Sequence, residues 1–213
     1  RELLLPIADA MRYVNTDFTD NYDISDLLSS CANADFEMTA ERKSEFALRP
    51  LNTKYWDAKG YEEMYGNSEI KTASGAVKKF KIYLDTPISV ALMHCGEPKA
   101  LVSILPISKE TMMIYQLQGV KPEIKEGWRN WRSSHGGGIL GRFDWKQVMV
   151  GCAEQIGSNL GYSEMAIQGA KNNKWIMGET SAFARRAAVI YDGTAERLGY
   201  AQREGGNWYK KME

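Results

Sequence analysis

The 213-residue chain has only three cysteines, two histidines and six prolines, and it contains no long apolar run. Cys31, Cys95 and Cys152 are widely spaced, so they do not predict a disulfide framework, and we expect a reducing, cytoplasmic compartment. Neither His94 nor His135 belongs to a CxxC or HExxH pattern, so we expect no metal site. No apolar segment approaches the ~20 residues of a membrane span, and no signal peptide is visible, so we expect no membrane contact.

The net charge of zero hides an uneven distribution. Residues 1–70 carry 14 acidic and 7 basic side chains, whereas residues 71–213 carry 13 acidic and 20 basic ones. Either the two parts face each other and partly neutralise, or the basic part binds a polyanion such as a phosphorylated cofactor or nucleic acid. Composition alone leaves both readings open.

From residue 79 onward the pattern predicts strands and then alternating helices and strands. Four strands come first, at 79–85, 88–94, 99–107 and 111–120, and the short turns between the last three indicate an antiparallel meander. A long loop over 121–143 follows, and a loop of this length is usually functional, partly disordered, or contains a short helix. The later elements are a helix over 144–160, a strand over 163–168, a helix over 181–198 that breaks near 192–193, and a hairpin that turns at 205–206.

The helix over 144–160 has the clearest signal in the chain. Its apolar residues recur at helical spacing: Trp145, Val148, Met149, Cys152, Ala153, Ile156 and Leu160. Asp144 is suited to cap its start, and Gly161 is suited to end it in the left-handed conformation. Because a hydrophobic strand follows, we expect a parallel crossover that pairs this strand with 111–120.

The first third of the chain is less patterned. Residues 2–14 predict an amphipathic helix, and a short capped helix follows. Residues 32–78 are polar with scattered aromatics and turn signals, so we expect short helices and loops packed on the main sheet. We therefore divide the chain into an N-terminal helical and loop region, 1–79, and a main domain, 80–213.

The segment from Thr111 to Gln168 joins a strand, a glycine-rich loop and a helix start. The glycines of 136–141 precede Asp144, so N–H groups without side-chain bulk can lie beside a helix N-terminus. This arrangement is suited to binding an anion. The same glycines can instead form a flexible hinge. The segment therefore predicts either a phosphate site or a hinge at this place.

With this order of elements, residues 80–213 resemble the GNAT N-acetyltransferase superfamily. Gln116-Leu117-Gln118-Gly119 is similar to the start of that family's Q/R-x-x-G-x-G/A signature. The stretch 152–168 resembles its cofactor-side helix and fifth strand, and 195–200 resembles the end of its last helix. The resemblance implies an α/β (α+β) fold: a mixed, mostly antiparallel twisted sheet flanked by helices, here with a helical and loop N-terminal extension.

The resemblance also implies a reaction and a cosubstrate. In the family, acetyl-CoA or another acyl-CoA lies between the fourth and fifth strands, and backbone N–H groups of the signature loop hold its pyrophosphate. An amine acceptor, a small molecule or a protein, attacks the thioester carbonyl directly. A base takes the amine proton, and a tyrosine often protonates the departing thiolate.

This resemblance assigns candidate residues by position. The candidates for cofactor binding are Gln118, Gly119, Gly138, Gly141, Arg142 and Asn172, and the catalytic candidates are Tyr191, Glu110 and Tyr115. Each also has an ordinary structural interpretation: tyrosines pack against sheets, Glu110 is suited to a turn, and loop asparagines commonly bond loop carbonyls. His94, on an apolar strand, is expected to be a satisfied edge or core histidine.

The chain departs from the family pattern in two places. Val120-Lys121-Pro122 follows Gly119, and Pro122 has no N–H to offer a phosphate. Ala195 stands where the family has its tyrosine, and Tyr191 lies one helical turn earlier. These departures favour an alternative, a catalytically inactive GNAT-like fold that acts as a structural or protein-interaction module.

The loop segment Trp128–Arg132 interleaves tryptophans with arginines. Such side chains can stack on bases and contact phosphates, so nucleic-acid binding through 121–142 is a further alternative. They are also enriched in binding hot spots, which indicates a protein partner. The third interpretation is a lid whose tryptophans pack on the domain. The acyl acceptor and the oligomeric state have no signal in the chain.

Overall fold

The computed structural model describes residues 4–18, 22–51, 67–71, 77–81, 84–122, 138–173 and 181–212. Its main sheet has seven strands in the order β1-β4-β5-β6-β8-β10-β9, and every neighbouring pair is antiparallel except β6 with β8. The strands are β1 (Phe46–Pro50), β4 (Ile88–His94), β5 (Glu97–Pro106), β6 (Thr111–Gly119), β8 (Glu164–Ile167), β9 (Ala201–Gln202) and β10 (Trp208–Lys211). The predicted fold class, a mixed and mostly antiparallel open sheet flanked by helices, is confirmed.

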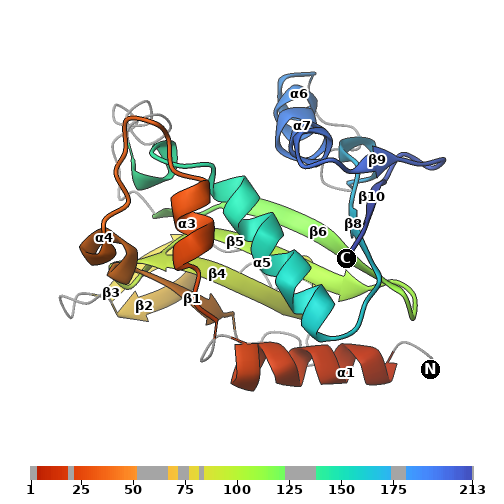
Figure 1. Ribbon diagram of the computed structural model, residues 1–213, viewed down its shortest axis with the longest axis horizontal. Coiled ribbons are helices and arrows are strands. Elements are labelled where there is room, and N and C mark those ends of the chain that lie inside the picture. Colours follow the sequence, from red (N-terminus) through yellow and green to blue (C-terminus); the bar gives the residue numbers. More distant parts are fainter. Residues whose placement is uncertain are drawn as a thin grey trace.

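Helices pack against the main sheet and beside its C-terminal strands (Figure 1). In Figure 1, α3 and α5 cross one face of the sheet, whereas α6 and α7 lie beside the end formed by β8, β9 and β10. The helical elements are α1 (Leu4–Tyr13), η1 (Val14–Phe18), α3 (Ser25–Ser30), α4 (Ala40–Ser44), η5 (Ile139–Gly141), α5 (Trp145–Asn159), η6 (Ala170–Asn172), α6 (Ser181–Ile190) and α7 (Asp192–Arg197).

The helix α5 forms where its sequence predicts. Asp144 is its N-cap and accepts a hydrogen bond from the backbone N–H of Gln147 at 3.4 Å. Gly161 follows its end with a φ of +82°, which suits glycine. The middle of its apolar stripe is fully buried, with Val148, Met149, Cys152, Ala153 and Ile156 each at 0% exposure, whereas Trp145 and Leu160 at its ends are partly buried.

One hydrophobic core joins these helices to the sheet. The strands β4, β5 and β6 contribute alternate side chains to it, and α1, α3 and α5 cover them. Its fully buried large side chains include Leu28, Ile88, Leu92, Ile104, Met112, Ile114, Met149 and Ile156. Burying a side chain of this size stabilises a fold by roughly 1.5–3 kcal/mol, so the core holds the strands that carry the candidate site.

One predicted strand lies outside the main sheet, and the expectation for 32–78 was wrong. The strand predicted at 79–85 forms, in its described part, within β3 (Val77–Lys81), which belongs to a separate sheet with β2 (Asn67–Lys71) and β7 (Lys121–Pro122). Alternation shows that a segment is a strand, but it does not show which sheet the strand joins. The region 32–78, expected to form helices and loops, supplies the edge strand β1 to the main sheet, paired with β4.

The other predicted elements are present. The N-terminal helix appears as α1, the helix over 181–198 breaks at Tyr191 into α6 and α7, and the terminal hairpin forms β9 and β10. The parallel crossover from β6 through α5 to β8 is confirmed. Among the described residues, no helix has the length and apolar character needed to cross a membrane.

Candidate functional site

Two parallel strands, β6 and β8, pair over only part of their length. The first four residues of β6 pair with the four of β8, and the backbone N–H of Gln168 then donates to the carbonyl oxygen of Ile114 at 2.9 Å. β6 continues beside β5 to Gly119, while the chain after β8 turns into η6. We call this separation, with Tyr115–Gly119 on one side and Gln168–Ala170 on the other, the divergence.

A β-bulge at Tyr115 bends β6 where it leaves β8. Ser103 of β5 pairs with Gln116 and Ile104 pairs with Ile114, so Tyr115 is the extra residue between two paired positions. An extra residue on one strand bends that strand and increases its local twist. The bulge therefore turns the second half of β6 away from β8, which gives the divergence a geometric cause.

The side chain of Tyr191 reaches into the divergence. This residue lies at the break between α6 and α7 and is 7% exposed. Its hydroxyl oxygen accepts a hydrogen bond from the backbone N–H of Leu117 at 3.3 Å. In a continuous sheet such an N–H would bond to the neighbouring strand, but here a phenol from a helix break takes it.

Burial keeps the Tyr191 phenol protonated. Desolvation is the largest influence and raises its pKa to about 12, and the charge of Asp85 acts in the same direction. The hydrogen bonds with Leu117 and with the side chain of Asn173 oppose this shift. A phenol with this pKa stays neutral, and able to donate a proton, far above neutral pH.

Asp85 was missed as a candidate. Its carboxylate is close enough to raise the pKa of Tyr191, and its backbone N–H donates to Oε1 of Gln116 at 3.2 Å. In the sequence, Asp85 closes an alternating stretch and looks like an ordinary strand residue. Only the folded chain brings it to β6, so no local signal could have identified it.

A row of buried polar side chains crosses β4, β5 and β6. The hydroxyls of Ser89 and Ser103 are 2.7 Å apart, and the Ser103 hydroxyl donates to Oε1 of Gln116 at 2.8 Å. The amide nitrogen of Gln116 then donates to Oε1 of Gln118 at 2.7 Å. Because hydrogen-bonded networks of this kind fix side-chain orientation, Gln118, a predicted cofactor residue, is held in place beside the divergence.

The end of β6 meets the start of α5. A Cβ atom added at Gly119 would lie 3.8 Å from Leu140 and 3.9 Å from the ring of Trp145. Gly119 and the turn before α5 are therefore neighbours, as the anion-binding hypothesis requires. The divergence and the start of α5 lie at the same end of β6.

The start of α5 already carries an anionic side chain. The N-cap Asp144 has one carboxylate oxygen 2.6 Å from Nη2 of Arg197 and the other 3.7 Å from Nζ of Lys146. A phosphate at the same N–H groups would meet this negative charge at close range. The pyrophosphate of CoA therefore does not fit this helix start as the described residues arrange it.

The glycine turn before α5 is tied to the N-terminal region. The N–H of Gly141 donates to the carbonyl oxygen of Gly138 at 2.9 Å, and the N–H of Arg142 donates to the carbonyl oxygen of Ile139 at 3.0 Å. The carbonyl oxygens of Gly141 and Arg142 accept hydrogen bonds from the side chain and backbone of Asn33, at 2.8 and 3.0 Å. The turn thus forms a junction, and a phosphate-binding role for Gly138, Gly141 and Arg142 stays a prediction.

Asn172 joins two loops near the divergence. Its Nδ2 donates to the carbonyl oxygen of Gly205 and to Oδ1 of Asn207, both at 2.7 Å. Its backbone N–H donates to Gly169 at 2.9 Å. This is the loop-bonding role that the sequence left open as an alternative to cofactor binding.

The two remaining catalytic candidates lie at different distances from Tyr191. Tyr115 is half-buried at the bulge itself, and burial, followed by the nearby Tyr209, raises its pKa. Glu110 is exposed and precedes the opposite end of β6, where its carbonyl oxygen accepts hydrogen bonds from Ser163 and Glu164. Along an extended strand this position is roughly 20 Å from Leu117, so Glu110 is too far from the divergence to act there.

The buried tyrosines make stability sensitive to alkali. Burial is the main cause that raises the pKa of both Tyr22 and Tyr191 to about 12, above the value of about 10 in an unfolded chain. A raised pKa stabilises the fold below the unfolded value, and this contribution disappears as pH rises from about 10 to 12.

We therefore expect the free energy of unfolding, measured with urea, to be lower at about pH 11 than at about pH 8. Tyr191 alone should account for about 1 kcal/mol of this loss. The decrease should be smaller in Tyr191→Phe, which has no phenol to ionise at this position. An equal decrease in both proteins would contradict the assignment to Tyr191.

Two predicted features lie outside the described residues. They are the Trp128–Arg132 segment, with its protein-partner and nucleic-acid hypotheses, and His135. Both hypotheses stay predictions.

Among the comparisons with known proteins, only the search of solved structures gives a likeness, and it is weak. No family model matches the sequence, and no curated protein matches it. Among solved structures, the apo form of an agmatine N-acetyltransferase point mutant aligns with 79% of this chain and 100% of its own chain. The two share 12% sequence identity and the TM-score is 0.34. At these values the likeness carries no functional assignment, so function has to be argued from the site.

Proposed function

We propose that this protein is a GNAT-like N-acyltransferase that moves an acyl group, such as acetyl, from acyl-CoA to an amine by direct attack. The observation that carries the proposal is the hydroxyl of Tyr191 held at the N–H of Leu117, in the divergence. Acyl transfer from a thioester needs a donor for the carbonyl oxygen and a proton for the leaving sulfur. A backbone N–H and a neutral phenol at one point match these two needs.

The roles of the residues follow from their chemistry. The N–H of Leu117 holds the thioester oxygen once the hydroxyl of Tyr191 has turned from that N–H to the sulfur. The amine nitrogen bonds to the carbonyl carbon as the carbon–sulfur bond breaks, and Tyr191 gives its proton to the departing thiolate. Asp85 is our candidate for the base that accepts the amine proton, because its carboxylate acts on the same phenol.

The acyl end and the nucleotide end of acyl-CoA differ in how well the described residues fit them. Gln118 and Gly119 end β6 at the divergence, and we assign the uncharged acyl-pantetheine arm to this end of the strand. The start of α5 is occupied by the carboxylate of Asp144. The proposal therefore relies on the acyl end and draws no step from the pyrophosphate.

Thermal unfolding with and without acetyl-CoA tests the proposal. A ligand at about 100 times its Kd stabilises the native state by about 2.7 kcal/mol, which for a protein of this size is a Tm increase of about 5–10 °C. S-acetylpantetheine, which lacks the nucleotide, should also raise Tm, and ADP serves as the control for nucleotide binding alone. Release of free thiol in the presence of a mixed panel of amines then reports transfer.

A non-catalytic GNAT-like module is the second candidate, and the Asp144–Arg197 pair at the start of α5 favours it. This candidate predicts no Tm change with acetyl-CoA or S-acetylpantetheine and no thiol release with any amine. That combination would contradict the acyltransferase proposal. A Tm change with ADP alone would also count against it, because the acyl end would then contribute nothing.

A further inference from the structure

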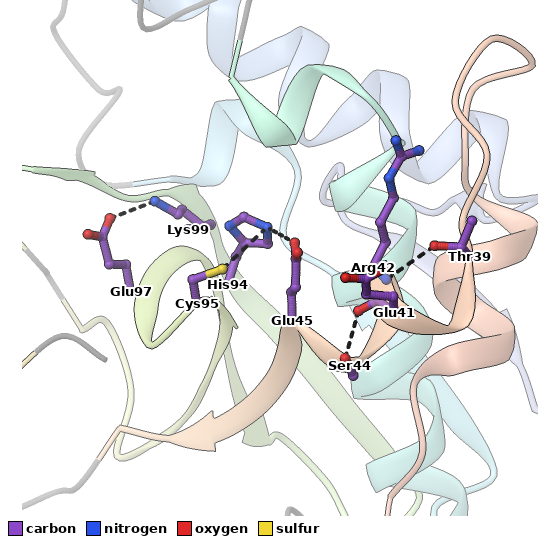
Figure 2. Close-up of polar contacts among 9 residues, drawn as sticks. All are labelled: Thr39, Glu41, Arg42, Ser44, Glu45, His94, Cys95, Glu97 and Lys99. Carbon is purple, nitrogen blue, oxygen red and sulfur yellow. Dashed lines mark hydrogen bonds and ion pairs between the residues drawn. The ribbon is translucent and has the colours of Figure 1, made fainter. Parts of the chain in front are cut away.

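Three side chains with metal-ligating atoms meet at one end of the sheet. Glu45 lies between α4 and β1, His94 ends β4, and Cys95 begins the turn to β5. Figure 2 shows the imidazole of His94 between the carboxylate of Glu45 and the thiol of Cys95. Oε2 of Glu45 is 2.9 Å from Nε2 of His94, and the same nitrogen is 3.9 Å from Sγ of Cys95.

Backbone pairing fixes this arrangement. β1 pairs with β4 so that Phe46 lies opposite His94, and the N–H of Cys95 donates to the carbonyl oxygen of Glu45 at 2.8 Å. The ring of Phe46 packs on the imidazole, with centroids 4.8 Å apart. The three ligating groups are therefore brought together by the sheet and held before any ligand arrives.

The conformation of Cys95 is unusual. Its φ is +50°, and among the described residues it is the one non-glycine residue with a positive φ. Gly96 follows at +76°, so the two form a hairpin turn of the type that favours asparagine, aspartate or glycine at both positions. Turn preference does not explain a cysteine here, and strained residues of this kind cluster at functional sites.

We propose that Glu45, His94 and Cys95 form a binding site for a divalent transition-metal ion, with Zn²⁺ as the best match. Thiolate, imidazole and carboxylate are the three side-chain ligands of zinc in proteins. Their ligating atoms all lie within 4.8 Å of one another. In a tetrahedral site with the usual zinc–ligand lengths, such atoms lie about 3.5 Å apart, so small side-chain rotations suffice.

The surroundings suit an ion that enters from solvent. Cys95 is exposed, and the side chain of Glu45 is 42% exposed. The neighbouring cation, Lys99, is 2.8 Å from the carboxylate of Glu97 and so is partly neutralised (Figure 2). Three protein ligands leave the fourth position of a tetrahedral site for water or another small ligand.

No local sequence motif marks this site. Its carboxylate and imidazole are 49 residues apart, so no short motif contains them, and the expectation of no metal site rested on short motifs. His94 was expected to be a satisfied edge histidine, and its contact with Glu45 fits that reading as a plain polar pair. A metal titration distinguishes a plain Glu45–His94 pair from a metal site.

Cobalt(II) titration of the chelator-treated full chain tests the proposal, because a thiolate bound to Co²⁺ gives a charge-transfer absorption that a carboxylate or imidazole alone does not give. We expect this absorption to saturate at one ion per chain and to be abolished by competing Zn²⁺. Cys31 and Cys152 are buried, so a thiolate signal from folded protein reports Cys95. Zn²⁺ should also raise Tm.

Cys95→Gly is the decisive variant, because glycine suits a positive φ and the turn should fold at least as well. It should lose the absorption and the Zn²⁺-dependent rise in Tm. Glu45→Gln should weaken Zn²⁺ binding at least about 10-fold, since even changes behind a metal ligand typically cost 10- to 100-fold. Glu41→Gln, which removes an exposed carboxylate of α4 outside the cluster, should leave both readouts unchanged.

Three results would overturn the proposal. The first is a cobalt complex without thiolate absorption. The second is the same Zn²⁺ affinity in Cys95→Gly as in the unchanged chain. The third is an equal loss in Glu41→Gln, which would indicate general surface charge rather than a site.

Discussion

Replacing Tyr191 with phenylalanine is expected to slow acyl transfer about 100-fold or more, the usual contribution of a positioned general acid. The ring remains to fill the buried space, but the proton donor for the leaving thiolate is lost. The affinity for acetyl-CoA should change only a few-fold, because the proposed role of the hydroxyl begins as the carbon–sulfur bond breaks. The rate of thiol release at saturating acetyl-CoA measures the effect, and Tm shifts with acetyl-CoA measure the affinity.

A structural cost accompanies this substitution and has to be separated from the chemical one. Without the hydroxyl, the N–H of Leu117 loses the partner that it has at 3.3 Å, and an unsatisfied buried donor costs about 1–3 kcal/mol. Rates should therefore be compared well below the lower of the two Tm values. A variant that is folded, binds acetyl-CoA and is slow supports the catalytic role.

Tyr200→Phe is the matched control. Tyr200 is 4% exposed, and its hydroxyl donates to Glu154 of α5 at 2.9 Å, outside the divergence. This variant should lose stability to a similar extent while keeping its rate of transfer. If Tyr191→Phe and Tyr200→Phe transfer acyl groups equally fast, Tyr191 only packs in the core and is not the proton donor of the proposed mechanism.

The helix α5 and its parallel crossover could be predicted because their signals are local. Asp144, the apolar stripe and Gly161 each mark a helix by their own chemistry, and the structure bears out all three. The crossover then follows from handedness and the limits on connecting two parallel strands. Tyr191 became a candidate by a different route, through the resemblance of 195–200 to a family's helix end, one turn after it.

The features that escaped prediction depend on which strand lies beside which. β1 is five residues long, carries Arg49 and Pro50, and buries only Phe46 and Leu48, so its pattern is too short to mark a strand. The bulge at Tyr115 exists only in the register between β5 and β6. The approach of Glu45 to His94 likewise arises from strand pairing, which periodicity does not encode. Asp85 approaches Tyr191 from a bend before β4, so this contact depends on tertiary packing.

The loop that follows β8 connects the divergence to the C-terminal hairpin. Oδ1 of Asp192, the residue after Tyr191, accepts hydrogen bonds from the N–H of Ala170 at 3.0 Å and from the indole of Trp208 at 2.8 Å. Gly169 donates its N–H to Oδ1 of Asn207 at 3.0 Å. The position of Tyr191 therefore depends on how closely this loop approaches the hairpin.

Gly169→Ala is expected to lower the free energy of unfolding by about 3 kcal/mol, the upper range for overpacking a tight site. The φ of Gly169 is −66°, which any residue adopts, so the cause is space and not backbone strain. A Cβ atom there would overlap the carbonyl oxygen of Gly206. Because that atom belongs to the backbone, the loop and hairpin must move apart. Urea unfolding measures the loss, and Tm should fall by about 6–12 °C.

Gly138→Ala is the matched control for this substitution. Gly138 has a similar extended conformation, with a φ of −83°, and a Cβ atom there would meet nothing within 4 Å. Its stability should stay within about 0.5 kcal/mol of the unchanged chain, as for ordinary surface substitutions. Since the loop that Gly169 belongs to also anchors Asp192, Gly169→Ala should slow acyl transfer as well. Equal stability of the two variants would show that the hairpin moves away from residue 169 at no measurable cost in free energy. The close approach at Gly169 would then not position Tyr191.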